Sequence, residues 1–144
     1  MVRFEFTAGA LCLDFANTIH DTHAEDNGEE LQEISDLLQW AKDGGLLSSA
    51  DHRRLTAHYI RRARDAAGAL ARSVAARDLM LTIFSAVANG RPVPRRRLSE
   101  LNAALAHTPG LLRVDHHAGR IGMGWESAAN GLRRILFAVL TSAA

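Results

Sequence analysis

Cysteine, lysine and aromatic residues are scarce in this chain of 144 residues. Its one cysteine, Cys12, excludes an internal disulfide and any zinc site built on a cysteine pair within the chain. Because Cys12 lies inside an apolar run, we expect a buried and unreactive thiol. Arginine supplies 16 of the 17 basic residues, which we attribute to genome composition rather than to recognition chemistry. Because the chain lacks a cysteine pair and a reactive thiol is not expected, we expect no cofactor within these residues.

Long apolar runs are also missing. No stretch approaches the ~18 residues that a membrane-spanning helix needs, and the N-terminus lacks the charged and apolar regions of a signal peptide. We therefore expect a soluble, cytoplasmic protein without a membrane partner. The length fits one domain over residues 1–144, large enough for a single core.

An excess of charge of one sign is absent from the whole chain but not from its parts. The net charge is +1, yet residues 1–50 carry ten acids against two basic residues, and residues 51–100 carry eleven arginines against four acids. We expect these two segments to pack against each other or to be solvated. A nearly neutral chain lacks the general attraction to phosphate that a DNA-binding domain uses.

The most informative segment is the apolar run at residues 9–18, in which polar residues recur at a fixed spacing. If this run is helical, its apolar and polar positions fall on two different faces. The apolar face is Leu11, Phe15 and Ile19, and the polar face is Asp14, Asn17, Thr18 and Asp21. The polar face predicts either buried hydrogen bonds between elements or the lining of a polar pocket.

The rest of the chain predicts a mainly helical α+β domain. Residues 2–7 alternate with period two and indicate a short strand, whereas residues 21–30 indicate a solvated acidic loop. Capping residues and apolar periodicity predict the helices, which cover about 36–42, 49–62, 64–89, 94–107 and 128 onward.

Residues 111–125 predict a hairpin with Ala118-Gly119 as its turn and the pairs 112/125, 114/123 and 116/121. This register places Trp125 on a core face with Leu112 and Val114. We expect the hairpin and the N-terminal strand to form one small antiparallel sheet.

Arg77 lies on the apolar stripe of the longest predicted helix. A guanidinium at such a position either reaches solvent at the edge of the stripe or must be paired inside. We expect a charge-assisted hydrogen bond to Asp14, direct or through one water, because that acid has the same need for a partner. The candidate ligand-binding residues are therefore Asp14, Asn17, Thr18 and Arg77, a set suited to an anionic or amide-bearing ligand.

The other polar clusters are weaker candidates. His20, Asp21 and His23 resemble a metal site, but no further cysteine or histidine cluster supports them, and we expect them to be solvated. His116 and His117 alternate across a strand and cannot easily ligate one ion. No spacing indicates a nucleophilic triad, so we predict no catalytic residue and no metal site.

The run Gly9-Ala10-Leu11-Cys12-Leu13-Asp14-Phe15-Ala16-Asn17-Thr18 resembles the sequence that opens the ABATE domain of the CGNR zinc-finger family of stress-induced transcription regulators. Further similar segments follow in the same order, and the resemblance covers essentially the whole chain. They are residues 36–40 and 45–47, Arg77-Asp78-Leu79, residues 83–92, Leu101-Asn102 with Leu105, and the hairpin ending in Trp125.

This resemblance implies a bacterial regulator whose DNA contact comes from a C-terminal zinc finger. The four cysteines of that finger are absent from this chain, so zinc and DNA are expected only with the missing finger. We expect a non-enzymatic domain that senses a small molecule or a protein partner. Two alternatives are a small hydrolase-like enzyme that uses Asp14 with a histidine, and a structural scaffold that forms a homodimer through residues 128–140.

Overall fold

The computed structural model describes residues 4–19, 28–106, 112–117, 120–125 and 131–142. Within them the chain forms six helices and one hairpin. The helices are α1 (Leu11–Ala16), α2 (Ile34–Asp43), α3 (Ser49–Ile60), α4 (Ala63–Ala88), α5 (Arg95–Ala106) and α6 (Gly131–Ser142), and the strands are β1 (Leu112–His117) and β2 (Arg120–Trp125).

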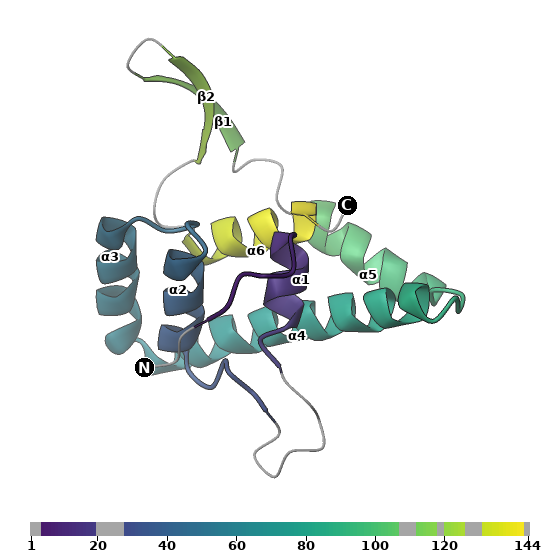
Figure 1. The fold of residues 1–144 in the computed structure, drawn as a ribbon. Helices are drawn as coiled ribbons and strands as arrows, with labels where there is room; N and C mark the ends of the chain where they lie inside the picture. The colour runs from purple at the N-terminus through teal and green to yellow at the C-terminus, as the bar shows by residue number, and fades with distance from the viewer. Residues whose placement is uncertain (1–3, 20–27, 107–111, 118–119, 126–130, 143–144) are drawn as a thin grey trace.

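The long helix α4 organises the helical body, because each of the other five helices contacts it. Figure 1 shows α4 running along the body, with α2 and α3 near its start, α5 near its end, and α1 and α6 crossing between them. The helix ends where Gly90 takes a positive φ of 62°, a backbone conformation that favours glycine. Its inward face meets a core that includes Phe15, Trp40, Met80 and Ile135.

The expectation of an α+β fold with a sheet built from the N-terminal strand and the hairpin is wrong. The domain is helical, and residues 4–7 form no strand. Phe4 is buried and Phe6 half-buried, whereas Glu5 and Thr7 are exposed, so the predicted alternation is present. However, the two phenylalanines pack on helices instead of lying in a sheet. Alternation reports which side chains are buried and not whether the backbone has a partner strand.

The register of the hairpin is confirmed. β1 and β2 are antiparallel, with Leu112 opposite Trp125, Val114 opposite Met123 and His116 opposite Ile121. In the described part of the chain these strands pair only with each other, and Figure 1 shows them standing apart from the helices. The predicted core face of the hairpin concerns side chains that lie outside the described part.

The predicted helices are confirmed with shifted ends. Ser48 caps α3 as expected, since its hydroxyl accepts a hydrogen bond from Asp51 N at 3.1 Å. Helix α2 begins earlier than expected because the N-cap is Glu33, whose backbone N–H donates to the Asp36 side chain at 2.8 Å. Asp36 therefore acts from inside the first turn and not from the cap position.

The N-terminal segment is held against the end of α2 by close aromatic packing. The Phe6 ring lies 5.5 Å from the Trp40 ring, centroid to centroid, and the Phe15 ring of α1 lies 4.9 Å from the same ring. A Cβ added at Gly44 would lie 2.7 Å from Phe6 Cε1. Glycine at this position therefore lets the Phe6 ring reach α2.

We predict opposite effects for two glycine-to-alanine changes. Gly44→Ala forces the Phe6 ring to move and should lower the free energy of unfolding by about 1–3 kcal/mol. Gly68→Ala lies inside α4, where the new Cβ meets only the flexible end of Arg72 at 3.4 Å, and should raise it by up to about 1 kcal/mol. Urea unfolding of both variants measures this, and equal effects would contradict the packing described.

Candidate ligand pocket

Arg77 is buried on α4, with 1% of its surface exposed, so the inward orientation predicted for it is confirmed. Its acid partner is Glu29 and not Asp14. Arg77 Nη1 and Nη2 donate to the two Glu29 carboxylate oxygens at 2.6 and 2.7 Å, a bidentate ion pair. Asp78 accepts two further hydrogen bonds at 3.1 and 3.3 Å. The expected direct bond between Arg77 and Asp14 is therefore wrong.

Arg77 also contacts Thr18, the last residue of the segment 9–18. Its Nη1 donates to Thr18 Oγ1 at 3.3 Å, and that hydroxyl donates in turn to Phe15 O at 2.7 Å. The backbone of Glu30 donates to Thr18 O at 3.0 Å, and Ile19 and Glu29 form a β-bridge. One guanidinium thus holds together two segments, residues 18–19 and 29–30, and ties both to α4. The predicted solvated loop over 21–30 is wrong at its end, where Glu29 and Glu30 are only partly exposed.

The ion pair changes the pKa values of both partners. Partial burial alone would raise the pKa of Glu29, but hydrogen bonds from Arg77 and from Leu31 N, together with the Arg77 charge, lower it overall. Burial alone would lower the pKa of Arg77, but Glu29 and then Asp78 raise it overall. Both groups therefore remain charged at neutral pH.

Asp14 has a different role from the one expected. Its Oδ1 accepts a hydrogen bond from Ala8 N at 2.9 Å and so fixes the N-terminal segment against α1. Its second carboxylate oxygen has no hydrogen-bond partner among the described residues. Cys12 is buried, as expected, and its backbone N–H donates to Ser142 Oγ at 3.3 Å, which joins α1 to the end of α6.

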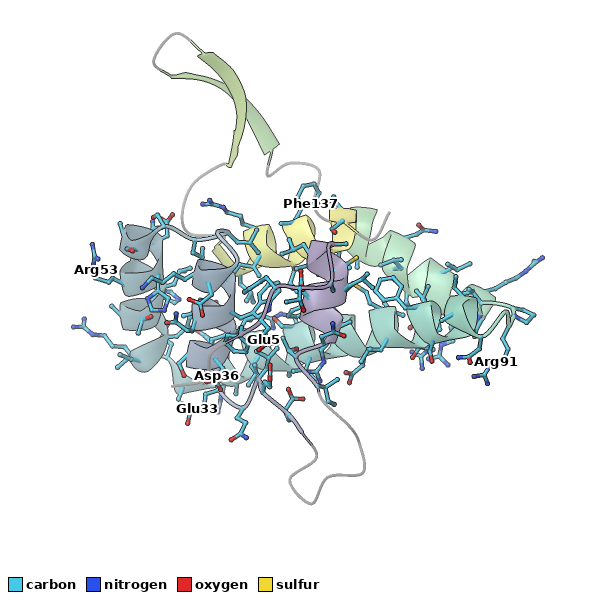
Figure 2. The ribbon with its side chains drawn as sticks, viewed as in Figure 1. Glu5, Glu33, Asp36, Arg53, Arg91 and Phe137 are labelled. Atoms are coloured by element: carbon cyan, nitrogen blue, oxygen red, sulfur yellow. The ribbon has the colours of Figure 1, made fainter. Side chains whose placement is uncertain are left out.

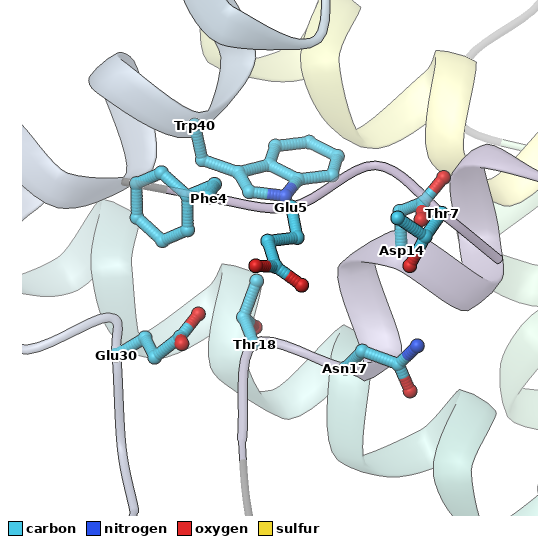
Figure 3. A pocket seen from close by; sticks show the side chains of 8 residues that line it. All are labelled: Phe4, Glu5, Thr7, Asp14, Asn17, Thr18, Glu30 and Trp40. Carbon is cyan, nitrogen blue, oxygen red and sulfur yellow. The ribbon is translucent and has the colours of Figure 1, made fainter. Parts of the chain in front are cut away.

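A pocket of about 390 Å³ lies where the N-terminal segment, α1 and α2 meet. Figure 3 shows its eight lining side chains. The buried part of the lining is Phe4, Asp14, Thr18 and Trp40; the exposed or partly exposed part is Glu5, Thr7, Asn17 and Glu30. The volume falls within the range of small-molecule sites in proteins.

One buried donor in this lining is unsatisfied. Trp40 is completely buried, yet its indole Nε1 has no hydrogen-bond partner among the described residues. In Figure 3 the nitrogen lies on the ring edge that faces the pocket, on the side of Glu5. Buried polar groups without partners are uncommon in proteins and costly, so a ligand that offers an acceptor to this N–H group is favoured, once the side chains that cover the indole nitrogen shift to admit it.

Three of the four predicted site residues, Asp14, Asn17 and Thr18, line this pocket together. Arg77 does not line it but contacts Thr18. Sequence reasoning missed the rest of the lining, which is Phe4, Glu5, Thr7, Glu30 and Trp40. The usable signals were the alternation of residues 4–7 and the one aromatic residue among the apolar residues of α2.

No metal site follows from the described residues, since nowhere among them are three His, Cys, Asp or Glu side chains grouped to hold an ion. His20, Asp21 and His23 lie outside the described residues, as do the side chains of His116 and His117. None of the helices in the described part is long and apolar enough to cross a membrane.

Residues 9–144 match the model of the ABATE family, described as "Putative stress-induced transcription regulator". The match begins at Gly9, the first residue of the segment 9–18, and covers all of the described helices. No curated protein and no solved structure is significantly similar to the chain.

We predict unequal effects for the two carboxylates that meet Arg77. Glu29→Gln leaves a buried guanidinium without its bidentate partner and should lower the free energy of unfolding by about 2–4 kcal/mol at pH 7. Asp78→Asn removes a partner that is 58% exposed and should lower it by less than about 1 kcal/mol. Chemical unfolding of both variants measures the difference.

The pH dependence gives a second readout of the same pair. Since the Glu29 pKa is lowered in the folded chain, its contribution is fully present above its ordinary value of 4.5 and is lost as the pH falls through the folded value. The wild type and Glu29→Gln should therefore converge in stability at acid pH. A stability gap that stays constant down to pH 2 would show that Glu29 does not act as an ion-pair partner.

Proposed function

Because the chain belongs to the ABATE family, we propose that it is the ligand-sensing domain of a bacterial, cytoplasmic, stress-responsive transcription regulator. The observation that carries the proposal is the 390 Å³ pocket, whose lining includes a buried and unpartnered indole N–H. That lining also includes three polar residues of the segment 9–18, namely Asp14, Asn17 and Thr18. We assign them, and not Arg77, to direct contact with the ligand.

Contacts around the pocket could transmit ligand binding to the rest of the helical body. Thr18 touches both the pocket and Arg77, so a ligand that shifts Thr18 also acts on the ion pair with Glu29 and on α4. Helix α1 contacts α6 as well as α4. In a regulator of this family the zinc finger that the sequence resemblance implies would follow α6, and DNA contact is proposed to depend on that finger.

The two alternatives find less support. A hydrolase-like site would place a histidine beside Asp14, but none of the described residues that line the pocket is a histidine. A scaffold that dimerises through α6 would expose its apolar face, but Leu132, Ile135 and Val139 are buried within the single chain. A non-enzymatic sensor is therefore the function that we propose.

The proposal predicts that this pocket retains a compound from bacterial cells. Wild-type protein is equilibrated with the low-molecular-weight fraction of a cell extract and washed, and the retained compounds are released by denaturation and measured by mass spectrometry. Asn17 is exposed and its side chain has no hydrogen-bond partner in the described structure, so Asn17→Leu should fold normally. Loss of its amide should reduce retention about tenfold.

Asn102→Leu provides the matched control, since Asn102 is an exposed asparagine of α5 that does not line the pocket. It should retain as much of the compound as the wild type. Equal retention by all three proteins would place binding elsewhere, and a wild type that retains nothing would count against a sensing function.

A further inference from the structure

We infer that the pocket takes a small organic cation, a protonated amine or a guanidine that also carries a hydroxyl or carbonyl oxygen. The inference rests on the proposed function and names the class of ligand. It follows from the charge of the lining, from its aromatic rings and from the unpartnered indole N–H.

The charged side chains of the lining are all acidic. Glu5, Asp14 and Glu30 line the pocket, and no lysine, arginine or histidine does so among the described residues. In Figure 2, Glu5, Glu33 and Asp36 lie on one side of the helical body, whereas Arg53 and Arg91 lie at its two ends. A cation in the pocket would be attracted by the carboxylates of Glu5 and Asp14, and an anion would be repelled.

Among the described residues, the cation that contacts this lining is already neutralised. Arg77 donates to Glu29, Asp78 and Thr18 and does not line the pocket. The sequence-based expectation was an anionic or amide-bearing ligand, and its anionic alternative depended on Arg77 being available. Because Arg77 is paired with Glu29, it is not available to an anionic ligand. The charges of the described lining therefore favour a cation over an anion.

The lining also suits the apolar part of an organic ligand. Phe4 and Trp40 are both buried, and Figure 3 shows the Glu5 side chain starting near the two rings and ending in a carboxylate that points away from them. The rings can contact the apolar carbons of such a ligand, while the carboxylates pair with its ammonium or guanidinium group. The three acids are not grouped closely enough to hold a metal ion, which favours an extended cation.

Trp40 adds a requirement that a simple cation does not meet. Its Nε1–H is completely buried, faces the pocket and has no partner in the part of the chain that the structure describes. A ligand that offers an acceptor oxygen there removes the cost of the unsatisfied donor. A carboxylate would offer an acceptor but would be repelled by the acidic lining, so the fitting acceptor is a hydroxyl or a carbonyl.

Three probes of equal shape test the inference. Tyramine carries an ammonium group and a phenol hydroxyl, tyrosol replaces the ammonium with a hydroxyl, and 3-(4-hydroxyphenyl)propionate replaces it with a carboxylate. Each is titrated into ¹⁵N-labelled Trp125→Phe protein, in which the remaining indole N–H resonance belongs to Trp40. We expect tyramine to move this resonance and to bind at least tenfold more tightly than the propionate, with tyrosol between them.

Two variants locate the effect of charge. Glu5 is exposed and lines the pocket, so Glu5→Gln should weaken tyramine binding about three- to tenfold and leave tyrosol binding unchanged. Glu100→Gln removes the same charge from α5, outside the pocket, and should leave both affinities unchanged.

The outcomes separate this inference from the proposed function. If tyrosol or the propionate binds as tightly as tyramine and moves the Trp40 resonance, the cation preference is wrong but the pocket remains a ligand site. If the Trp40 resonance moves with none of the probes while Asn17-dependent retention from extract persists, the ligand belongs to another class and the inference fails alone. If extract retention also fails, both are wrong.

Discussion

A buried guanidinium on the central helix is the constraint on which the rest of this structure depends. Arg77 cannot stay on the inward face of α4 unless acceptors meet its donors, and Glu29, Thr18 and Asp78 meet them. These contacts bring residues 18–19 and 29–30 against α4. The pocket wall at Thr18 and Glu30 exists because this ion pair holds both segments in place.

The same contact explains the separation of charge along the chain. The acidic first third and the basic middle third of the sequence meet in a buried pair between Glu29 and Arg77. Most of the other described ion pairs are local and exposed, such as those of Arg96 and Arg97 with Glu100. The charge asymmetry of this chain therefore contributes to folding at one buried position, and the charged side chains of the described pocket lining come from its acidic part.

Helices and the hairpin register could be predicted because their signals are local. Ser48 caps a helix through a bond to a residue three positions away, and the pairing of Val114 with Met123 follows from the position of the turn. The N-terminal segment could not be predicted in the same way. Its alternation was correct, but its partner is α2, which approaches only because Gly44 leaves room for Phe6.

The site could be predicted in part for a related reason. Asp14, Asn17 and Thr18 lie within one turn or two of each other, so their convergence follows from helical spacing. The partner of Arg77 had to be chosen among ten acids of the first 50 residues, and nothing local distinguishes Glu29 from Asp14. The place of Trp40 in the pocket depends on tertiary packing against Phe4, Phe6 and Phe15.

The ligand-sensing function that we propose requires that the pocket beside Trp40 holds a ligand. A crystal structure of the protein purified directly from bacterial cells, without refolding, tests this most directly. We expect density for a small organic molecule between Trp40 and Asn17, with an acceptor oxygen within hydrogen-bond distance of the indole Nε1. An empty or collapsed pocket, in which the Glu5 carboxylate accepts the indole N–H itself, would contradict it.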